Sequence, residues 1–230
     1  MIKSTQFVTK WMYGVVRGTS IWLSFNLIYI FLGVNLLLAQ NINEVGTLIW
    51  TMFLLIPLVF SPGTAAALDC TRRYFKGEGD GVMRTAWNSF CRNYFLGLKH
   101  GSLFCLILIL LYTCARYYSS WVGALSFGIF GILAVLSTLL FLFVLAYTVD
   151  RQETFFNYWK KSGRLVLNHP LLFFIMGVEV VLTIYFTHFL SALLLLVMPG
   201  TVLLFVMHFY LEVVKCEAHL NQQSPNKSLS

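Results

Sequence analysis

The sequence predicts an all-α protein, a polytopic transmembrane bundle of about six spans with both termini in the cytoplasm. Hydrophobic residues make up 58% of the 230 residues and charged residues only 11%, whereas soluble domains carry about a quarter charged residues. The apolar residues gather in stretches near the ~20 residues that a helix needs to cross a bilayer. The sixteen Lys and Arg residues are confined to a few places between these stretches.

The predicted spans follow one another closely along the chain. They cover residues 20–39, 45–68, 102–118, 122–149, 171–189 and 190–214, and a polar cytoplasmic tail follows at 215–230. The last two stretches have no polar gap between them. As one helix they would be about twice as long as the ~30 Å apolar core is thick. We therefore expect a tight turn near residues 188–191.

The distribution of basic residues predicts the orientation. Fifteen of the sixteen lie in the N-terminal segment, in the loops after the second and fourth spans, or in the tail, and only Arg116 lies in the three opposite connections. Cytoplasmic loops carry the excess of Lys and Arg in membrane proteins. This places both termini inside a cell membrane that the chain crosses several times. The net charge of +7 is then expected to face anionic lipid and not nucleic acid.

The two long inner loops each predict an amphipathic helix. In residues 82–95 apolar residues recur at three- and four-residue steps, while Arg84, Asn88 and Arg92 occupy another face. Residues 155–165 repeat this pattern. Such helices lie in the headgroup region with their basic side towards lipid phosphates, or dock a partner protein, and the two interpretations are compatible. The candidate lipid- or partner-docking residues are Arg72, Arg73, Arg84, Trp87, Arg92, Trp159, Lys160, Lys161 and Arg164.

Glu179 is the only acidic residue well inside a predicted span. A charge in the bilayer core is costly, so an intramembrane carboxylate raises a functional hypothesis, here the binding of a proton, a cation or a polar substrate. The alternative is structural: Glu179 stays neutral or pairs with a polar group such as Thr183 or His208. Glu179 and His208 are therefore the candidate intramembrane polar residues.

Two Pro-Gly pairs predict helix breaks, Pro62-Gly63 in the second span and Pro199-Gly200 in the sixth. Proline removes a helical hydrogen bond, and Pro57 adds a second kink to the second span. Broken helices accompany binding sites in transporters, although glycine and proline are also common in ordinary membrane helices.

Other chemistry has no pattern to support it. No Ser-His-Asp order, paired carboxylates or nucleophile elbow occurs at a plausible common depth, and no Walker A sequence would bind ATP. Cys and His spacings do not match a zinc site. We therefore expect no enzyme, no metal and no cofactor, and we expect the five cysteines to be free thiols.

Three neighbouring stretches resemble the YesL family. They read PGTAAAL at 62–68, RRYFKGE at 72–78 and RTAWNSFCRNYF at 84–95. Asp69-Cys70 and Gly81 depart from the family pattern. The family consists of small integral membrane proteins of Gram-positive bacteria, and its spacing of spans is similar over most of the chain.

The resemblance implies a non-catalytic accessory membrane subunit of a carbohydrate (oligosaccharide) ABC importer. Such a subunit would pack beside the permease subunits and, through them, associate with an ATPase and a solute-binding protein, in addition to membrane lipids. It carries over no catalytic or binding residue. Two alternatives remain open, a stand-alone small-solute transporter or channel that uses Glu179, and a regulator of a membrane sensor kinase.

Overall fold

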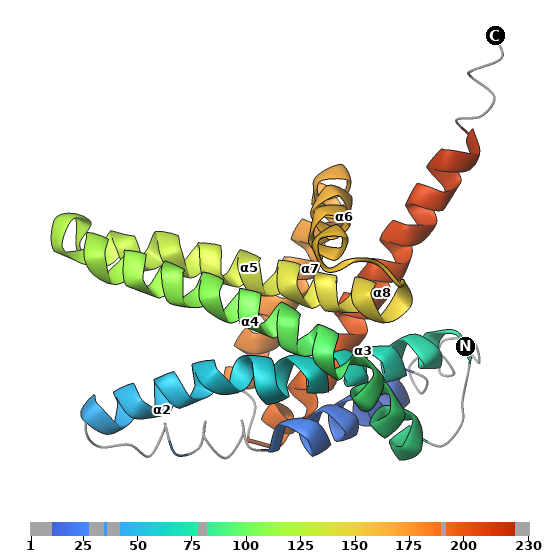
Figure 1. Ribbon diagram of the computed structural model, residues 1–230, viewed down its shortest axis with the longest axis horizontal. Helices are drawn as coiled ribbons and strands as arrows, with labels where there is room; N and C mark the ends of the chain where they lie inside the picture. The colour runs from blue at the N-terminus through green and yellow to red at the C-terminus, as the bar shows by residue number, and fades with distance from the viewer. Residues whose placement is uncertain (1–10, 28–34, 36–41, 78–81, 190–191, 224–230) are drawn as a thin grey trace, which may run out of the picture.

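The computed structural model describes residues 11–27, 35, 42–77, 82–189 and 192–223, and every element in them is helical (Figure 1). An N-terminal helical segment covers 11–27. It is followed by α2 (Ile42–Leu55), the π-helix η1 (Ile56–Phe60), α3 (Ser61–Phe75), α4 (Val82–Val122), α5 (Ala124–Asp150), α6 (Phe155–Asn168), α7 (Pro170–Phe189) and α8 (Ala192–Gln223). The all-α prediction is confirmed.

Several of these helices are long and apolar enough to cross a membrane. In the described residues they are Gly46–Phe75, Met83–Trp121 and Leu125–Asp150, and α6 with the first part of α7 would add a fourth, bent by 96°. The long apolar helices indicate a membrane-embedded protein. The count of six spans and the cytoplasmic termini stay predictions. Most of the first predicted span, 20–39, and part of the turn at 188–191 lie outside the described residues.

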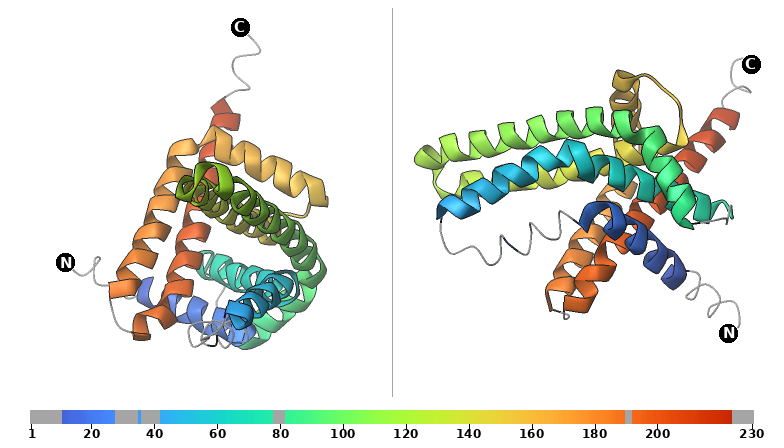
Figure 2. Two further views of the ribbon diagram at one scale, coloured as in Figure 1. Left: turned by 90° about the vertical axis from the view of Figure 1, so that its left-hand side faces the viewer. Right: turned by 60° about the horizontal axis from the view of Figure 1, so that its bottom comes forward.

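α5 and α7 begin and end within two residues of the predicted spans 122–149 and 171–189. By contrast, the predicted amphipathic helix 82–95 and the span 102–118 form one helix, α4, because no proline interrupts its 41 residues. At 1.5 Å per residue, α4 is about 60 Å long, roughly twice the apolar core. Its first turns bend away from the line of the rest (Figure 2). α8 continues to Gln223, so residues 215–223 of the predicted tail are helical.

α3 lies at the centre of the fold. All its residues from Ser61 to Thr71 are buried, and it packs against α4, α5 and α8. Its small side chains allow this, since glycine, alanine, serine and threonine let helix backbones approach closely. Its backbone comes close to α4: a Cβ added at Gly97 would lie 2.9 Å from the Cα of Pro62, and one at Gly101 would lie 2.8 Å from the Cβ of Ser61.

The π-helical turn η1 begins where the sequence predicts a kink. Pro57 is in its first turn, and Pro62 is in the first turn of α3. Because Pro57 has no N–H, the carbonyl of Phe53 loses its usual helical donor. The Cys105 thiol of α4 donates to that carbonyl at 3.2 Å, and the Ser61 hydroxyl donates to the carbonyl of Gly97 at 2.6 Å. The kink is therefore hydrogen-bonded to α4.

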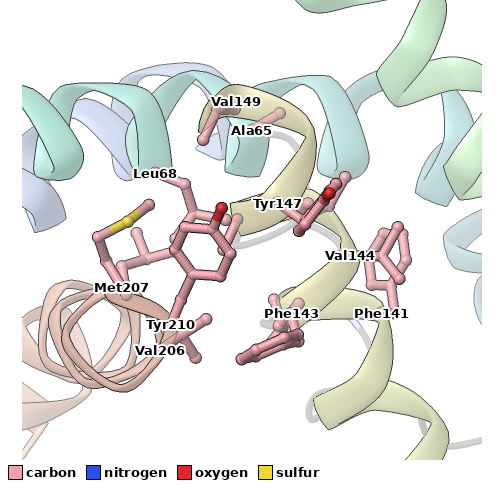
Figure 3. Close-up of a cluster of buried hydrophobic side chains, with 14 of the residues drawn as sticks. Ala65, Leu68, Phe141, Phe143, Val144, Tyr147, Val149, Val206, Met207 and Tyr210 are labelled. Atoms are coloured by element: carbon pink, nitrogen blue, oxygen red, sulfur yellow. The ribbon is translucent and has the colours of Figure 1, made fainter. Parts of the chain in front are cut away.

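The apolar core lies where α3, α5 and α8 meet (Figure 3). The Tyr210 ring of α8 lies in the middle of it, with ring centroids 5.5 Å from Phe143 and 6.1 Å from Tyr147 of α5. Nearby, the rings of Phe104 and Phe141 stack with centroids 4.1 Å apart and join α4 to α5. This core carries the polar groups described next at one end of α3 and α5.

Candidate functional site

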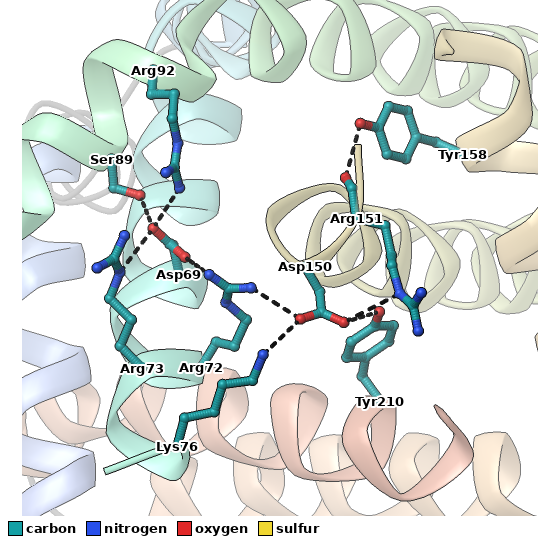
Figure 4. Close-up of polar contacts among 10 residues, drawn as sticks. All are labelled: Asp69, Arg72, Arg73, Lys76, Ser89, Arg92, Asp150, Arg151, Tyr158 and Tyr210. Carbon is teal, nitrogen blue, oxygen red and sulfur yellow. Dashed lines mark hydrogen bonds and ion pairs between the residues drawn. The ribbon is translucent and has the colours of Figure 1, made fainter. Parts of the chain in front are cut away.

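A cluster of ion pairs joins α3, α4, α5 and α8 around two carboxylates (Figure 4). The first is Asp69 of α3, whose side chain is 0% exposed. It accepts a hydrogen bond from the Ser89 hydroxyl. Three guanidinium groups surround it, those of Arg72 at 3.0 Å, Arg73 at 3.4 Å and Arg92 at 3.0 Å.

Arg72 connects this carboxylate to the second one, Asp150 at the end of α5. Its Nη2 lies 3.0 Å from Asp69 Oδ1 and its Nη1 lies 3.0 Å from Asp150 Oδ1. Asp150 also pairs with Lys76 at 3.2 Å and accepts a hydrogen bond from the Tyr210 hydroxyl of α8 at 3.0 Å. The Arg72 side chain, 15% exposed, therefore bridges two acids that are 81 residues apart in sequence.

These pairs explain how buried carboxylates are tolerated. An isolated ion in a low-dielectric interior costs several kcal/mol, and only good geometry and further hydrogen bonds offset the cost. Both carboxylates have several partners here. Arg151 also lies 3.7 Å from Asp150, so five cations surround two acids and the cluster keeps an excess of positive charge.

A second polar group joins α4, α5 and α6 at His100, which is fully buried. The Trp159 indole N–H donates to His100 Nδ1 at 3.0 Å. Because an indole nitrogen only donates, the ring proton is assigned to Nε2, which then donates to the Thr148 hydroxyl at 3.3 Å. That hydroxyl donates to the carbonyl of Val144 at 2.8 Å. Every polar atom of this neutral imidazole is satisfied.

α6 is fastened to the end of α5 as well. The Tyr158 hydroxyl donates to the carbonyl of Arg151 at 3.1 Å and accepts from the N–H of Glu153 at 2.8 Å. Lys161 pairs with Glu153, and this hydrogen bond raises the pKa of Lys161. These contacts fix the conformation of the connection between α5 and α6.

The predicted docking residues fall into two groups. Arg72 and Arg73 bind Asp69, and Trp159 binds His100, so these three contact other parts of the chain. The others are exposed: Arg84, Trp87, Arg92, Lys160, Lys161 and Arg164. Two of the exposed cations, Arg92 and Lys161, are also ion-paired within the chain. The docking role of the whole set stays a prediction.

The first turns of α4 differ from the expected amphipathic pattern. The face that packs inward is small and polar, and its buried residues are Ala86, Ser89, Asn93, Gly97 and His100. The aromatic face is turned outward, with Trp87 and Phe95 exposed, and Phe90 stacks on Phe25 at 4.7 Å. Small residues at steps of three and four were the sequence signal for the buried face, because they allow close contact with α3.

Glu179 and His208 come together between α7 and α8, near enough to interact electrostatically. The His208 ring also packs against Trp11 at 5.9 Å and Phe75 at 6.0 Å. Neither residue is among the ion-pair or hydrogen-bond partners of Asp69 and Asp150 described above, and no prediction singled out that cluster.

The two predicted helix breaks differ. Pro62 and Gly63 follow the π-helical turn, whereas α8 runs as α-helix through Pro199 and Gly200. There the N–H of Gly200 donates to the Thr19 hydroxyl of the N-terminal segment at 3.1 Å. In the described part of the chain, no group of three His, Cys, Asp or Glu side chains is placed to hold a metal ion.

Comparison with known proteins gives one match. Residues 45–113 match the model of a family described as a protein of unknown function, DUF624. No curated protein matches the chain, and no solved structure matches it. The matched segment contains most of α2, all of η1 and α3, and most of α4, and therefore Asp69 with all its ion-pair partners.

Proposed function

We propose that this chain is a non-catalytic accessory membrane subunit of an oligosaccharide ABC importer, packed beside the permease subunits. The matched family is the domain family of YesL-like proteins, in keeping with the resemblance at residues 62–95. The importer role itself rests on that resemblance. The geometry adds a reason to expect a scaffold and not a carrier.

That reason is that the buried acidic groups hold helices of the protein together. Asp69 and Asp150 hold α3, α4, α5 and α8 together and form ion pairs with cations of the same chain. Two cavities of the described residues, one between α5, α6, α7 and α8 and one along α7, have almost wholly apolar walls, and neither acid lines them. A solute carrier needs polar groups that face a cavity. Polar groups that cross-link helices favour a rigid subunit with outward contacts.

The outward contacts have two components. The first turns of α4 present exposed aromatic and basic side chains, Trp87, Phe95 and Arg84 among them. The α4–α5 hairpin presents a long apolar wall that includes Leu110 and Ile132. The first surface suits the inner face of a partner near the headgroups, and the second suits contact with transmembrane helices or lipid.

Affinity purification tests this function. The tagged chain, isolated from its native membrane in mild detergent, is expected to retain two permease subunits and an ATPase identifiable by mass spectrometry. Replacing Arg84, Lys160 and Arg164 with Gln is expected to weaken that retention and the uptake of labelled oligosaccharide. These three cations make no ion pair in the described structure, so the fold should persist.

The matched control changes Lys99, Arg116 and Lys215 to Gln, three other exposed cations, and should leave the complex intact. An equal loss of subunit retention and uptake in both sets of variants would show a general charge effect. That result would contradict a docking role for Arg84, Lys160 and Arg164. Solute flux by the purified chain alone in liposomes, abolished by Glu179→Gln, would replace this proposal with the independent transporter.

A further inference from the structure

An apolar groove lies between α5 and α7, at the corner where α6 meets α7. Its volume is about 490 Å³, and every side chain that lines it is apolar. Pockets that hold small molecules measure roughly 300–1,000 Å³ but include a few polar groups that orient the ligand. Here water would find no hydrogen-bond partner. The chemistry of the groove therefore suits a hydrocarbon chain.

The shape of the groove limits what enters it. Its lining runs along α7 from Pro170 to Leu182, about 18 Å at 1.5 Å per residue, or a little more than half of a ~30 Å apolar core. At its floor the helices are close, since a Cβ added at Gly177 would lie 3.1 Å from Leu139 Cδ1. The groove thus has the length of one lipid leaflet.

One end of the groove is cationic. Leu167 of α6 lines it. Arg164 lies one turn before Leu167, and Lys160 lies two turns before it on the same side of α6. Both cations are exposed, and neither belongs to an ion pair among the described residues. α6 and α7 are bent by 96° relative to each other, so these charges lie along one helix and the groove along the other.

We propose that the groove holds one acyl chain of an anionic phospholipid, whose phosphate lies against Lys160 and Arg164. The inference does not depend on the function proposed above. A transmembrane helix is too large for the groove, because a cylinder ~10 Å wide and 18 Å long fills about 1,400 Å³. The acyl chain of the lipid moves from one apolar medium, the bilayer, to another, the groove. Selectivity among lipids therefore comes from the headgroup. Two cations predict a preference of roughly thirtyfold for anionic over zwitterionic lipid.

Photo-crosslinking tests the site. The full chain is reconstituted in phosphatidylcholine vesicles with a trace of phosphatidylglycerol that carries a diazirine in its acyl chain, and labelled peptides are mapped by mass spectrometry. We expect adducts concentrated on Leu136 and Val178 of the groove, which are only 45% and 41% exposed. Leu110 and Ile132, 65% and 64% exposed on the α4–α5 hairpin, report ordinary lipid contact. Labelling that simply follows exposure overturns the proposal.

Three variants separate the two parts of the site. Lys160→Gln with Arg164→Gln should lower groove labelling by phosphatidylglycerol to the level of a phosphatidylcholine probe. Unchanged labelling would refute the headgroup contact. Val178→Trp should block the groove for both probes and leave Leu110 labelled. If the Val178→Trp protein is not monodisperse, Leu136→Trp is used as the blocking variant.

A photoreactive amino acid placed at Val178 in cells distinguishes other occupants. An adduct with the added mass of a phospholipid supports the proposal. An adduct with a second copy of the chain or with another protein overturns it.

Discussion

Asp69→Asn is the sharpest test of the ion-pair cluster. The carboxylate is 0% exposed and lies within 3.4 Å of three guanidinium groups. An amide whose oxygen replaces Oδ2 still accepts from Ser89, Arg73 and Arg92, but it has no charge and its N–H donors are turned towards Arg72. Removing one partner of a buried ion pair costs about 3–5 kcal/mol. Half-exposed pairs cost less, about 0–1 kcal/mol.

The structure decides where in that range the loss falls. The Arg73 and Arg92 side chains are 29% and 54% exposed, so both rehydrate easily. Arg72 keeps its second partner, Asp150. We therefore expect the free energy of unfolding to fall by about 3 kcal/mol, the lower end of that range. For a chain of this size this corresponds to a melting temperature about 6–12 °C lower. The assay follows the monodisperse fraction of tagged protein after heating in detergent.

Glu212→Gln provides the matched control. Glu212 pairs with Lys215 one turn away on the surface, and both side chains are well exposed, so its loss should change the melting temperature by about 2 °C or less. Equal melting temperatures for the two variants would refute the argument that the Asp69 pairs stabilise the fold. A double variant with Asp150→Asn should deviate from the sum of the single effects, because Arg72 is shared.

Three further predictions follow from close contacts and exposure. Gly200→Ala places a Cβ 2.1 Å from the Thr19 hydroxyl oxygen and should lower the melting temperature in the same assay by several degrees. The control Gly128→Ala, with nothing within 4 Å of the added Cβ, should leave the melting temperature unchanged. Equal effects would contradict the close contact between α8 and the N-terminal segment. His100→Phe keeps a ring but loses both hydrogen bonds, so amide exchange in 155–168 should quicken, and unchanged exchange would refute the link to α6. Cys91 and Cys216 are exposed free thiols. In a Cys114→Ser background, a membrane-impermeant maleimide should label these two thiols only in permeabilised cells, and labelling of intact cells would reverse the predicted orientation.

The sequence predicts helices best where composition changes abruptly. α5 carries no charged residue before Asp150, so its end could be placed within a residue. α4 was divided in two because a span of ~20 residues was assumed and because a helix that leaves the bilayer carries no special residue at the boundary. Only the absence of proline indicated continuity.

The ion-pair cluster was harder to predict because its partners are distant in sequence. Asp69 could have been paired locally with Arg72 and Arg73, since side chains three and four residues apart meet on a helix. Nothing local indicates that Asp150 and Tyr210 lie at the same place. The two arginines were assigned to an exposed basic loop, whereas α3 extends to Phe75 and carries them into the protein.

The family match and the packing describe the same unit. Residues 45–113 contain the kinked helix η1–α3, the glycines of α4 that touch it, and every cation that binds Asp69. α5 and α8 are joined to this unit at its polar end through Asp150, and there Arg72 and Lys76 supply the contacts from within the matched segment. The small residues at 61–67 and the acid at 69 then have one explanation. The small side chains bring the helices so close that water is excluded, and a carboxylate placed there requires several cations from its neighbours.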